Sequence, residues 1–497
     1  MSVTTTITLP DGDKLEIPTG LFINGEFVKG AEGKTFETIN PATEKPICSV
    51  HEATAADVDI AVSAARKAFE GGWDKETGLN RNKLMVKLAD LMERDQENLA
   101  QLESLDNGKA IAVARVADVP MSYDCIRYYG GYADKIHGKV IDPDPDHLCY
   151  TRMEPMGVVG QIIPWNFPLL MWAWKIGPAI AAGNCVVIKS AEQTPLTALY
   201  MAKLIKEAGF PPGVINVLSG FGKTAGAAIA AHMDIDKIAF TGSTLVGRQI
   251  MVAAARSNLK KVTLELGGKS PNIVFKDADI ESAISWVNFG IFFNHGQTCS
   301  AGSRVFVQED IYDEFVKRFT KRAQENVVGE PHKPETFQGP QVSQVQFDRV
   351  MGYIDAGKKD GAKVETGGER HGDVGYFIKP TIFSNVHEDM KIIKEEIFGP
   401  VCSIASFKDE DDVIAKANKT EYGLAAGIHT YNSNTIAKVS SGLKAGTVWV
   451  NTYNNLHHQL PFGGYKHSGI GKELGEAALA NYMNSKTITQ RLAGPIY

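Results

Sequence analysis

The sequence contains little cysteine, and its six cysteines are widely scattered: Cys48, Cys125, Cys149, Cys185, Cys299 and Cys402. No Cys-x-x-Cys pair occurs, and no cysteine cluster includes a histidine, which argues against a disulfide framework and against a zinc site. Sparse, unpaired cysteines are typical of proteins in a reducing compartment. We therefore predict no crosslinks and no metal.

Long apolar runs are also missing. The most apolar stretch, 169–187, is interrupted by Lys175, Pro178, Gly183 and Asn184, so no window is suited to span a membrane. The first twenty residues lack a basic segment followed by an apolar one, and acidic residues precede the first arginine, which disfavours a targeting presequence. We expect a cytoplasmic protein without a membrane partner.

Positive charge is not in excess. The net charge is −6, which gives no reason to expect nucleic acid or an acidic membrane surface as a partner. The hydrophobic content of 43% and the charged content of 22% are ordinary for a globular protein. Because 497 residues are too many for one hydrophobic core, we expect two or three domains.

Short apolar runs alternate with helical patterns from residue 156 onward. Uninterrupted apolar strands separated by helices are typical of a parallel sheet that is covered on both faces. A second region of the same kind follows from about residue 280 to 462. We therefore predict an α/β protein with two doubly wound parallel-sheet domains, the first with strands at 157–163, 185–188, 214–218, 237–240 and 261–266.

The segments before residue 156 follow other patterns. Apolar residues at three- and four-residue spacing predict helices over 57–70, 81–104 and 116–136. Residues 139–153 are extended and interrupted by Asp-Pro-Asp-Pro, and residues 480–490 are extended again. The two extended segments are candidates to pair as a small β arm. Such an arm fits a subunit contact and a simple surface hairpin equally well.

Cys299 is the main candidate nucleophile. It lies in Gly290–Arg304, GIFFNHGQTCSAGSR, between Gly296 and Gly302 and just after an apolar run. A cysteine on a glycine-flanked turn can present its sulfur to a cleft, where a thiolate can attack a substrate. A free cysteine is also a common core residue, so the local sequence leaves both interpretations open.

Two motifs favour a nucleotide. The strand Lys237–Phe240 leads into Thr241-Gly242-Ser243-Thr244-Leu245-Val246-Gly247 and a helix, whose N-terminus can bind a pyrophosphate. Any strand–glycine–helix junction of an α/β protein looks similar. Glu192 follows the strand that ends at Ile188 and could accept the hydroxyls of an adenosine ribose, or could be a surface residue.

Two polar residues stand in apolar surroundings. Asn166, in Trp165-Asn166-Phe167-Pro168, is a candidate oxyanion donor, although turn asparagines more often bond their own backbone. Glu265 lies in an apolar strand just before Gly267-Gly268. Burial raises the pKa of a carboxyl group, which would suit a general base. A structural glutamate that accepts from backbone N–H groups is the alternative.

The chain resembles the NAD(P)-dependent aldehyde dehydrogenase superfamily over essentially its whole length. The resemblance rests on seven motifs in family order: PWNFP, VVIKSAEQTP, FTGSTLVG, VTLELGGKSPNIVF, GQTCSAGSR, EEIFGPV and PFGGYKHSG. It is closest to the cytosolic and mitochondrial enzymes of broad substrate range. It implies an NAD-binding domain of residues 1–136 and 156–266, a catalytic domain of 267–465, and oligomerisation strands at 137–155 and 480–497.

The resemblance also implies roles for residues. Cys299 would be the nucleophile, Asn166 with the backbone N–H of Cys299 the oxyanion site, and Glu265 the base that activates water. His295 would be structural. The cofactor-binding residues would be Trp165, Lys189, Glu192, Gly242, Ser243, Gly247, Glu396 and Phe398. The substrate tunnel would be Phe167, Met171, Trp174, Phe293 and Phe462, and a proton relay could include Lys175 and Glu473.

The expected reaction is oxidation of an aldehyde to a carboxylic acid through a cysteine thiohemiacetal and a thioester. Glu192 favours NAD over NADP by charge, although Lys189 beside it leaves NADP possible. The apolar tunnel favours acetaldehyde and other small aliphatic or aromatic aldehydes. Thr298 and residues 454–458 are the variable positions near Cys299. A betaine-aldehyde or semialdehyde dehydrogenase is the alternative on the same fold, and a homotetramer is expected.

Three rival functions predict different requirements. A CoA-acylating enzyme would lack a base such as Glu265. A thiol hydrolase that uses Cys299 and His295 would need no nicotinamide cofactor and leaves Glu192 and Gly242 unexplained. A non-catalytic protein on the same scaffold would tend to lose Cys299, Glu265 and Asn166.

Overall fold

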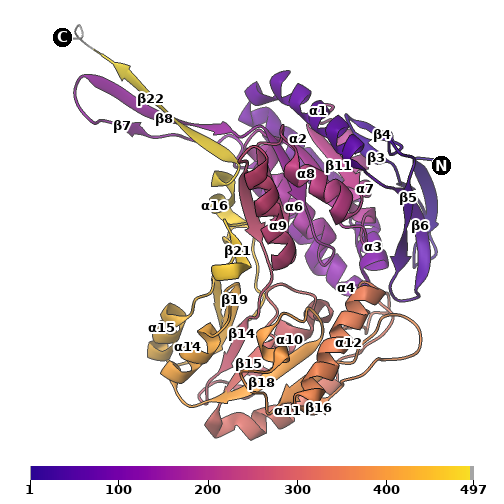
Figure 1. The fold of residues 1–497 in the computed structure, drawn as a ribbon, viewed down its shortest axis with the longest axis vertical. Coiled ribbons are helices and arrows are strands. Elements are labelled where there is room, and N and C mark those ends of the chain that lie inside the picture. Colours follow the sequence, from indigo (N-terminus) through magenta and orange to yellow (C-terminus); the bar gives the residue numbers. More distant parts are fainter. Residues whose placement is uncertain (1, 493–497) are drawn as a thin grey trace.

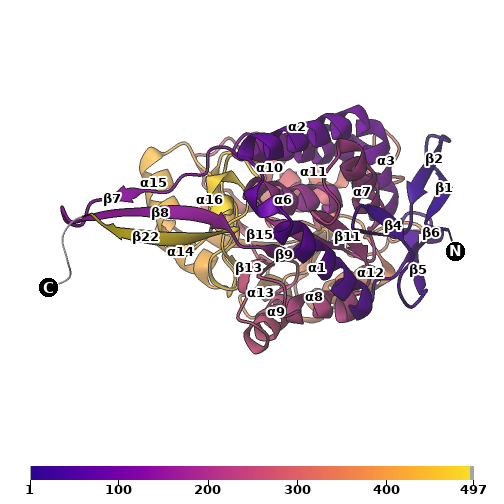
Figure 2. The ribbon, with the colours of Figure 1, turned by 90° about the horizontal axis from the view of Figure 1, so that it is seen from above.

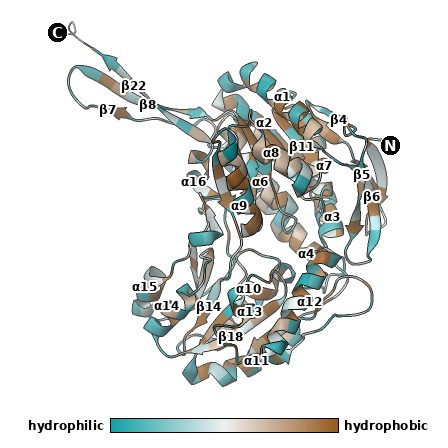
Figure 3. Ribbon diagram, viewed as in Figure 1, coloured by the Kyte–Doolittle hydropathy of each residue, from teal (hydrophilic) through white to brown (hydrophobic). Residues whose placement is uncertain are grey.

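The computed structural model describes residues 2–492 and contains two large parallel sheets, each covered by helices on both faces (Figure 1). This arrangement confirms the predicted α/β fold class with two doubly wound sheets. Peripheral helices such as α14 (Glu410–Asn418) and α15 (Ser433–Gly442) show hydrophilic colour toward the outside (Figure 3). Among the described residues no helix is long and apolar enough to cross a membrane.

The first sheet has eight strands in the order β21-β13-β12-β9-β10-β11-β3-β4. Its five central strands are parallel; four of them are fully buried, which explains their largely apolar sequences, whereas β13 is buried only at Leu264 and Glu265. They are β9 Val158–Ile162, β10 Cys185–Ser190, β11 Ile215–Ser219, β12 Lys237–Thr241 and β13 Lys261–Glu265. The edge strands are β21 Gly469–Ile470, β3 Leu21–Ile23 and β4 Glu26–Val28.

The connections of the first sheet leave β9 in opposite directions. The chain passes from β9 to β10 and β11 on one side, then returns to β12 and β13 on the other. Such a reversal opens a crevice at the carboxyl ends of the strands, where α/β proteins bind ligands. Residues 163–167 follow β9, and Gly242 follows β12, so both predicted turns lie at this crevice.

The helices around the first sheet occupy most of the N-terminal half. They are α1 Ala55–Glu70, α2 Gly78–Arg94, α3 Gln96–Asn107, α5 Val119–Gly130, α6 Pro168–Ala181, α7 Leu196–Ala208, α8 Ala227–Ala231 and α9 Thr244–Arg256. Short helical turns, α4 Ile111–Val113 and a π-helical segment at Ala114–Asp118, connect α3 to α5.

The predicted helix over 81–104 was wrong in one respect, because the structure divides it into α2 and α3 at Asp95. The backbone of Asp95 leaves helical geometry (φ −97°, ψ 20°), and its carboxylate accepts from Arg94 and from the Tyr200 hydroxyl. Apolar periodicity continues across this break and so does not reveal it. The predicted helix 116–136 likewise ends earlier, at Gly130.

The second sheet has seven strands in the order β16-β17-β18-β15-β14-β19-β20, all parallel except β16. The strands are β14 Pro271–Val274, β15 Arg304–Gln308, β16 Lys363–Thr366, β17 Thr381–Ser384, β18 Val401–Phe407, β19 Ala425–His429 and β20 Thr447–Val450. Its larger helices also include α10 Ile280–Phe292, α11 Tyr312–Gln324 and α12 Gln344–Lys359. Residues 266–270 connect β13 directly to β14, so the two sheets meet beside Glu265.

A three-stranded arm extends away from the rest of the molecule (Figures 1 and 2). Strand β8 (His147–Pro155) lies between β7 (Val140–Ile141) and β22 (Met483–Arg491), and β22 pairs with β8 over nine residues. This pairing confirms that the two extended segments of the sequence come together. Of the predicted strand 480–497, residues 493–497 lie outside the described residues, and Ala480 ends helix α16 (Gly475–Ala480).

Two small hairpins near the N-terminus were not predicted. They pair β1 (Thr4–Thr8) with β2 (Lys14–Pro18), and β5 (Thr35–Asn40) with β6 (Lys45–His51). Both are only partly buried, and they lie on the side of the first sheet opposite the arm (Figure 2).

Candidate active site

One cavity of about 530 Å³ contains most of the predicted site residues. It lies between the carboxyl ends of β9, β12 and β13 and the loop that follows α10. Its lining includes thirteen residues singled out from the sequence: Trp165, Asn166, Phe167, Met171, Trp174, Gly242, Ser243, Glu265, Phe293, Cys299, Glu396, Phe398 and Phe462. Residues that are more than 200 positions apart thus form one site.

The loop that carries Cys299 begins with an unusual backbone. Asn294, His295 and Gly296 follow the end of α10 with φ angles of 50°, 59° and 72°. At Gly296 a side chain would collide with the Gly399 carbonyl, so only glycine fits this close approach. The three left-handed residues turn the chain back, and Cys299 comes to lie half-buried at the cavity wall.

The thiol of Cys299 is held in its protonated form. Burial raises its pKa, and the nearby carboxyl groups of Glu265 and Glu396 raise it further. A thiol must lose its proton to act as a nucleophile. The reaction therefore needs a base within reach or a positive charge brought into the cavity.

His295 is not part of the cavity lining that includes Cys299. Its Nδ1 accepts a hydrogen bond of 2.8 Å from the Gly339 backbone N–H, and the ring is buried. Burial, with the charge of Lys109, lowers its pKa to about 3, so the ring is neutral at physiological pH. This geometry weighs against a Cys–His pair and supports the structural interpretation.

Asn166 is oriented by the cysteine loop itself. Its Nδ2 donates to the backbone oxygen of Gln297 at 2.9 Å, and the side chain is buried. An amide nitrogen carries two hydrogens, so the second one remains for the cavity, into which Cys299 also opens. This is the arrangement that an oxyanion site requires.

Glu265 ends β13 and has a buried carboxyl group. No hydrogen-bond partner for its Oε1 occurs among residues 2–492. Burial raises its pKa well above the ordinary value; the charge of Glu473 raises it further, whereas Lys175 and Lys472 lower it. An unpartnered carboxyl group of raised pKa beside a nucleophile is a candidate general base.

Lys175 and Glu473 lie behind Glu265 rather than in the cavity wall. The Lys175 ammonium forms a buried ion pair with Glu473 and donates to the Thr241 hydroxyl at 2.8 Å. Thr241 lines the cavity and is aligned with Glu265 across β12 and β13. The predicted proton relay therefore has a continuous polar connection to the cavity through Thr241.

Glu396 and Phe398 enter the cavity from the second sheet. Oε1 of Glu396 accepts from the Gly268 N–H at 3.0 Å, and a side chain at Gly267 would collide with the same carboxylate. Burial raises the pKa of Glu396 to about 7. Phe398, with φ of 62°, meets the Trp165 ring edge to face at 5.3 Å.

The nucleotide-binding candidates divide into two groups. Gly242 and Ser243 line the cavity at the start of α9, where Ser243 caps the helix by accepting from Val246 N–H. Gly247 instead permits close packing, because a side chain there would meet Leu266 at 2.7 Å. Its predicted pyrophosphate contact stays a prediction.

Lys189 and Glu192 lie outside the cavity wall. The buried Lys189 ammonium donates to the carbonyl oxygens of Ser190 and Gly220, both at 2.7 Å, and lies 3.6 Å from the carboxylate of half-buried Glu192. The position at the carboxyl end of β10 suits a ribose at the edge of the crevice. With the exposed N-terminus of α9 for phosphates and the Trp165–Phe398 pair for a planar ring, the residues present fit a dinucleotide.

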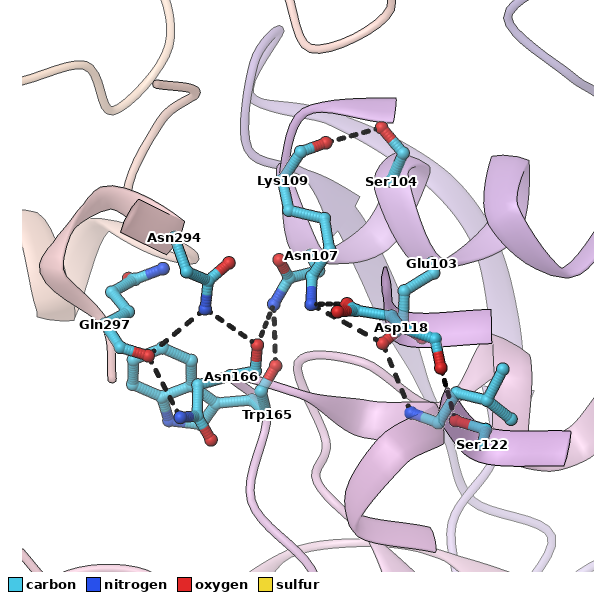
Figure 4. Close-up of polar contacts among 11 residues, drawn as sticks. Glu103, Ser104, Asn107, Lys109, Asp118, Ser122, Trp165, Asn166, Asn294 and Gln297 are labelled. Carbon is cyan, nitrogen blue, oxygen red and sulfur yellow. Dashed lines mark hydrogen bonds and ion pairs between the residues drawn. The ribbon is translucent and has the colours of Figure 1, made fainter. Parts of the chain in front are cut away.

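Several residues around the site were not predicted. Asn107 and Asn294 bond the turn that carries Asn166, and buried Lys109, Glu103 and Asp118 lie beside it (Figure 4). No local motif identifies them, because each acts through partners that are 50 or more positions away or across a helix break. Among the described residues no cluster of ligands suited to a metal ion occurs.

Three comparisons point to the same group of proteins. The Aldehyde dehydrogenase family matches residues 27–488. An aldehyde dehydrogenase of Davidiella tassiana is 70% identical over 98% of this chain and 98% of its own length, and the mitochondrial aldehyde dehydrogenase of Homo sapiens is 56% identical over 95% of this chain and 92% of its own. The structure of the NAD+ complex of aldehyde dehydrogenase from Bacillus cereus superposes with a TM-score of 0.95 at 54% identity, covering 96% of this chain and 97% of that one.

Proposed function

Because this chain belongs to the aldehyde dehydrogenase family, we propose that it oxidises acetaldehyde and other small aldehydes to carboxylic acids with NAD as the acceptor. The observation that carries the proposal is the meeting of three groups in one cavity: the Cys299 thiol, a free N–H of Asn166 and the unpartnered carboxyl group of Glu265. A nucleophile, an oxyanion donor and a base are the parts that acyl transfer requires.

In the first step the Cys299 thiol gives up its proton to water, and its Sγ forms a bond to the aldehyde carbon. The carbonyl oxygen gains the negative charge, which the Asn166 amide and the Cys299 backbone N–H stabilise. NAD held beside Trp165, Gly242 and Phe398 would supply the acceptor for two electrons and the hydrogen of the aldehyde carbon. The carbon then remains attached to Cys299 as a thioester.

In the second step Glu265 removes a proton from a water molecule, whose oxygen bonds to the thioester carbon. The carbon–sulfur bond breaks, and Cys299 is released with the electron pair. Glu265 suits this role because its carboxyl group is buried and its Oε1 accepts no bond from residues 2–492 that would hold it in place. We propose that its proton passes toward the buried Lys175–Glu473 ion pair, whose Lys175 bonds Thr241 at the cavity wall.

The walls of the cavity support a small apolar substrate. Phe167, Phe293, Trp174 and Phe462 form two ring pairs, 6.1 Å and 5.6 Å between centroids, and Met171 lies with them. The lining includes one arginine, Arg349, which donates to the Glu396 backbone oxygen on the cofactor side. Among the described residues of the lining, no other arginine is present that would recognise a semialdehyde carboxylate.

The test follows NADH formation in the wild type and in Cys299→Ala, with Cys48→Ala as the control, since Cys48 is also half-buried but lies outside the cavity. Steady turnover of acetaldehyde in the wild type and the control, with none in Cys299→Ala, supports the proposal. Turnover only with added CoA would favour an acylating enzyme. Turnover with NADP and none with NAD would favour NADP as the acceptor.

We further propose a cytoplasmic homotetramer. The arm supports the oligomer, because β7 exposes Val140 and Ile141 and leaves an outer sheet edge that a second chain could cover. Light scattering of the wild type tests this proposal, and an active monomer would contradict it.

A further inference from the structure

The turn that carries Asn166 is held by the buried side chains of Asn107 and Asn294 (Figure 4). The backbone oxygen of Trp165 accepts from Asn107 Nδ2 at 2.7 Å, and that of Asn166 accepts from Asn294 Nδ2 at 3.0 Å. Lys109 lies over the Phe167 ring, and Glu103 accepts from the Leu169 N–H. The support continues into the first turn of α6.

Asn294 connects this turn to the cysteine loop. Its Nδ2 donates both to the Asn166 oxygen at 3.0 Å and to the Gln297 oxygen at 3.2 Å. The Gln297 oxygen is the same atom that accepts from the side chain of Asn166 at 2.9 Å. Asn166, Asn294 and Gln297 therefore form a closed polar ring, and Cys299 lies two residues beyond it.

The supporting cluster beneath the ring has no exposed member. Lys109 places its ammonium 4.3 Å from the centre of the Phe167 ring and pairs with Asp118 and Glu103, all of them buried. Glu103 accepts from the Leu169 N–H at 3.2 Å and so caps the start of α6. These contacts restrain the turn and the start of α6, while Oε2 of Glu103 has no partner among the described residues.

We propose that Asn294 is a positioning residue that fixes the free N–H of Asn166 relative to the sulfur of Cys299. The proposal rests on the proposed role of Asn166 as the oxyanion donor. One hydrogen of the Asn166 amide is committed to Gln297, so the direction of the other depends on where Gln297 lies. Asn294 fixes the position of the Gln297 oxygen relative to the Asn166 backbone, because it donates to the backbone oxygens of both residues.

The size of the expected effect follows from the geometry that catalysis tolerates. Removal of one oxyanion donor typically slows an enzyme about 10²–10³-fold. A displacement of about 1 Å costs up to about 10²-fold. We therefore expect loss of Asn294 to lower kcat about 10- to 100-fold, and loss of Asn166 to lower it by at least as much.

The experiment is a double-mutant cycle of Asn294→Gly, Asn166→Ala and the double variant. Glycine keeps the left-handed backbone of residue 294 and removes only its side chain. Asn288→Ala is the matched control, because Asn288 is equally buried on the preceding helix and bonds Asn326 away from the cavity. The measurements are kcat, KM for NAD, and NAD affinity by tryptophan fluorescence.

If Asn294 acts through Asn166, the double variant has a kcat within about threefold of Asn166→Ala alone, NAD affinity is unchanged, and Asn288→Ala turns over normally. A double variant slowed by the product of the two single effects overturns the inference, as does a normal kcat in Asn294→Gly. A normal kcat in Asn166→Ala would overturn the proposed oxyanion role together with it.

A second variant covers the case in which Asn294→Gly does not fold. Asn294→Asp also tolerates the left-handed backbone but presents an acceptor to two carbonyl oxygens. The same cycle with Asn294→Asp and Asn166→Ala is expected to give the same non-additivity. Multiplicative losses there overturn the inference equally.

Discussion

Glu265 and Glu396 face the same cavity from opposite sheets, and burial raises the pKa of both. They differ in their partners. Glu396 accepts from the Gly268 N–H and is confined by the glycines beside it, whereas Oε1 of Glu265 accepts nothing among the described residues. A buried carboxyl group that is anchored can orient a ligand, and one that is not anchored can exchange a proton with it. The hydrogen-bond partners of the two carboxyl groups thus suit Glu396 to orient a ligand and Glu265 to exchange a proton.

The largest expected effect separates the two glutamates by turnover. Glu265→Gln removes the base and is expected to lower steady-state turnover about 10²–10⁴-fold. Because the thioester still forms, rapid mixing with acetaldehyde and NAD should show a burst of about one NADH per site. Glu395→Gln is the control, since Glu395 is exposed and bonds Tyr353 outside the cavity. Loss of the burst as well would contradict the division of roles.

A smaller effect is expected in the pH dependence of turnover. The charge of Lys175 lowers the pKa of Glu265 and that of Glu473 raises it. Glu265 acts as a carboxylate, so activity falls on the acid side as it is protonated. Lys175→Met should move this acid limb to higher pH, and Glu473→Gln should move it to lower pH. Lys260→Met, a buried lysine at the other end of β13, should leave the limb in place. If Lys175→Met and Glu473→Gln moved the acid limb in the same direction, Glu265 would be excluded as the titrating group.

The smallest effect concerns stability and tests the anchored glutamate. The pKa of Glu396 is raised from 4.5 to about 7 in the folded chain. Below pH 4.5 the folded and unfolded chains both carry the proton, so no free energy is lost to burying an ionised carboxylate. Between these values the unfolded chain ionises first, and wild type loses stability as pH rises. Glu396→Gln keeps the acceptor without this loss and should be the more stable protein above pH 7, by roughly 1–3 kcal/mol. Urea unfolding at pH 5 and pH 8 measures the difference in free energy of unfolding between Glu396→Gln and the wild type. A variant that is the more stable protein at pH 5 only would contradict the raised pKa of Glu396.

The sequence predicted the parts of the site that lie in motifs. Cys299, Asn166, Glu265 and Glu396 were identified by neighbouring glycines, apolar strands and family resemblance, and the structure places all four in one cavity. Their catalytic roles stay predictions until the variants are measured. The uninterrupted apolar strands likewise predicted the parallel sheets, because burial on both faces leaves that pattern in any sequence.

The contacts that hold these residues could not be predicted. Asn107 and Asn294 are ordinary turn residues in the sequence, and only the folded chain shows that both donate to one turn after β9. The buried charge of Lys109 is equally invisible, since lysines are usually exposed. Lys189 shows the converse, because its ammonium, expected at a ribose, bonds two carbonyl oxygens of its own sheet.

The return of the chain to the first sheet has a consequence for biosynthesis. Strand β21 pairs with the end of β13 beside Glu265, and Phe462 and Glu473 come from the same late segment. During translation, the first sheet therefore lacks this edge until the whole second sheet has been made. A nascent chain whose residues up to 460 have emerged from the ribosome contains Cys299, Asn166 and Glu265. It still lacks Phe462, Glu473 and strand β21. A ribosome-bound chain is thus expected to complete the site only after residue 473 has emerged, and until then it holds the Cys299 thiol in an incomplete site.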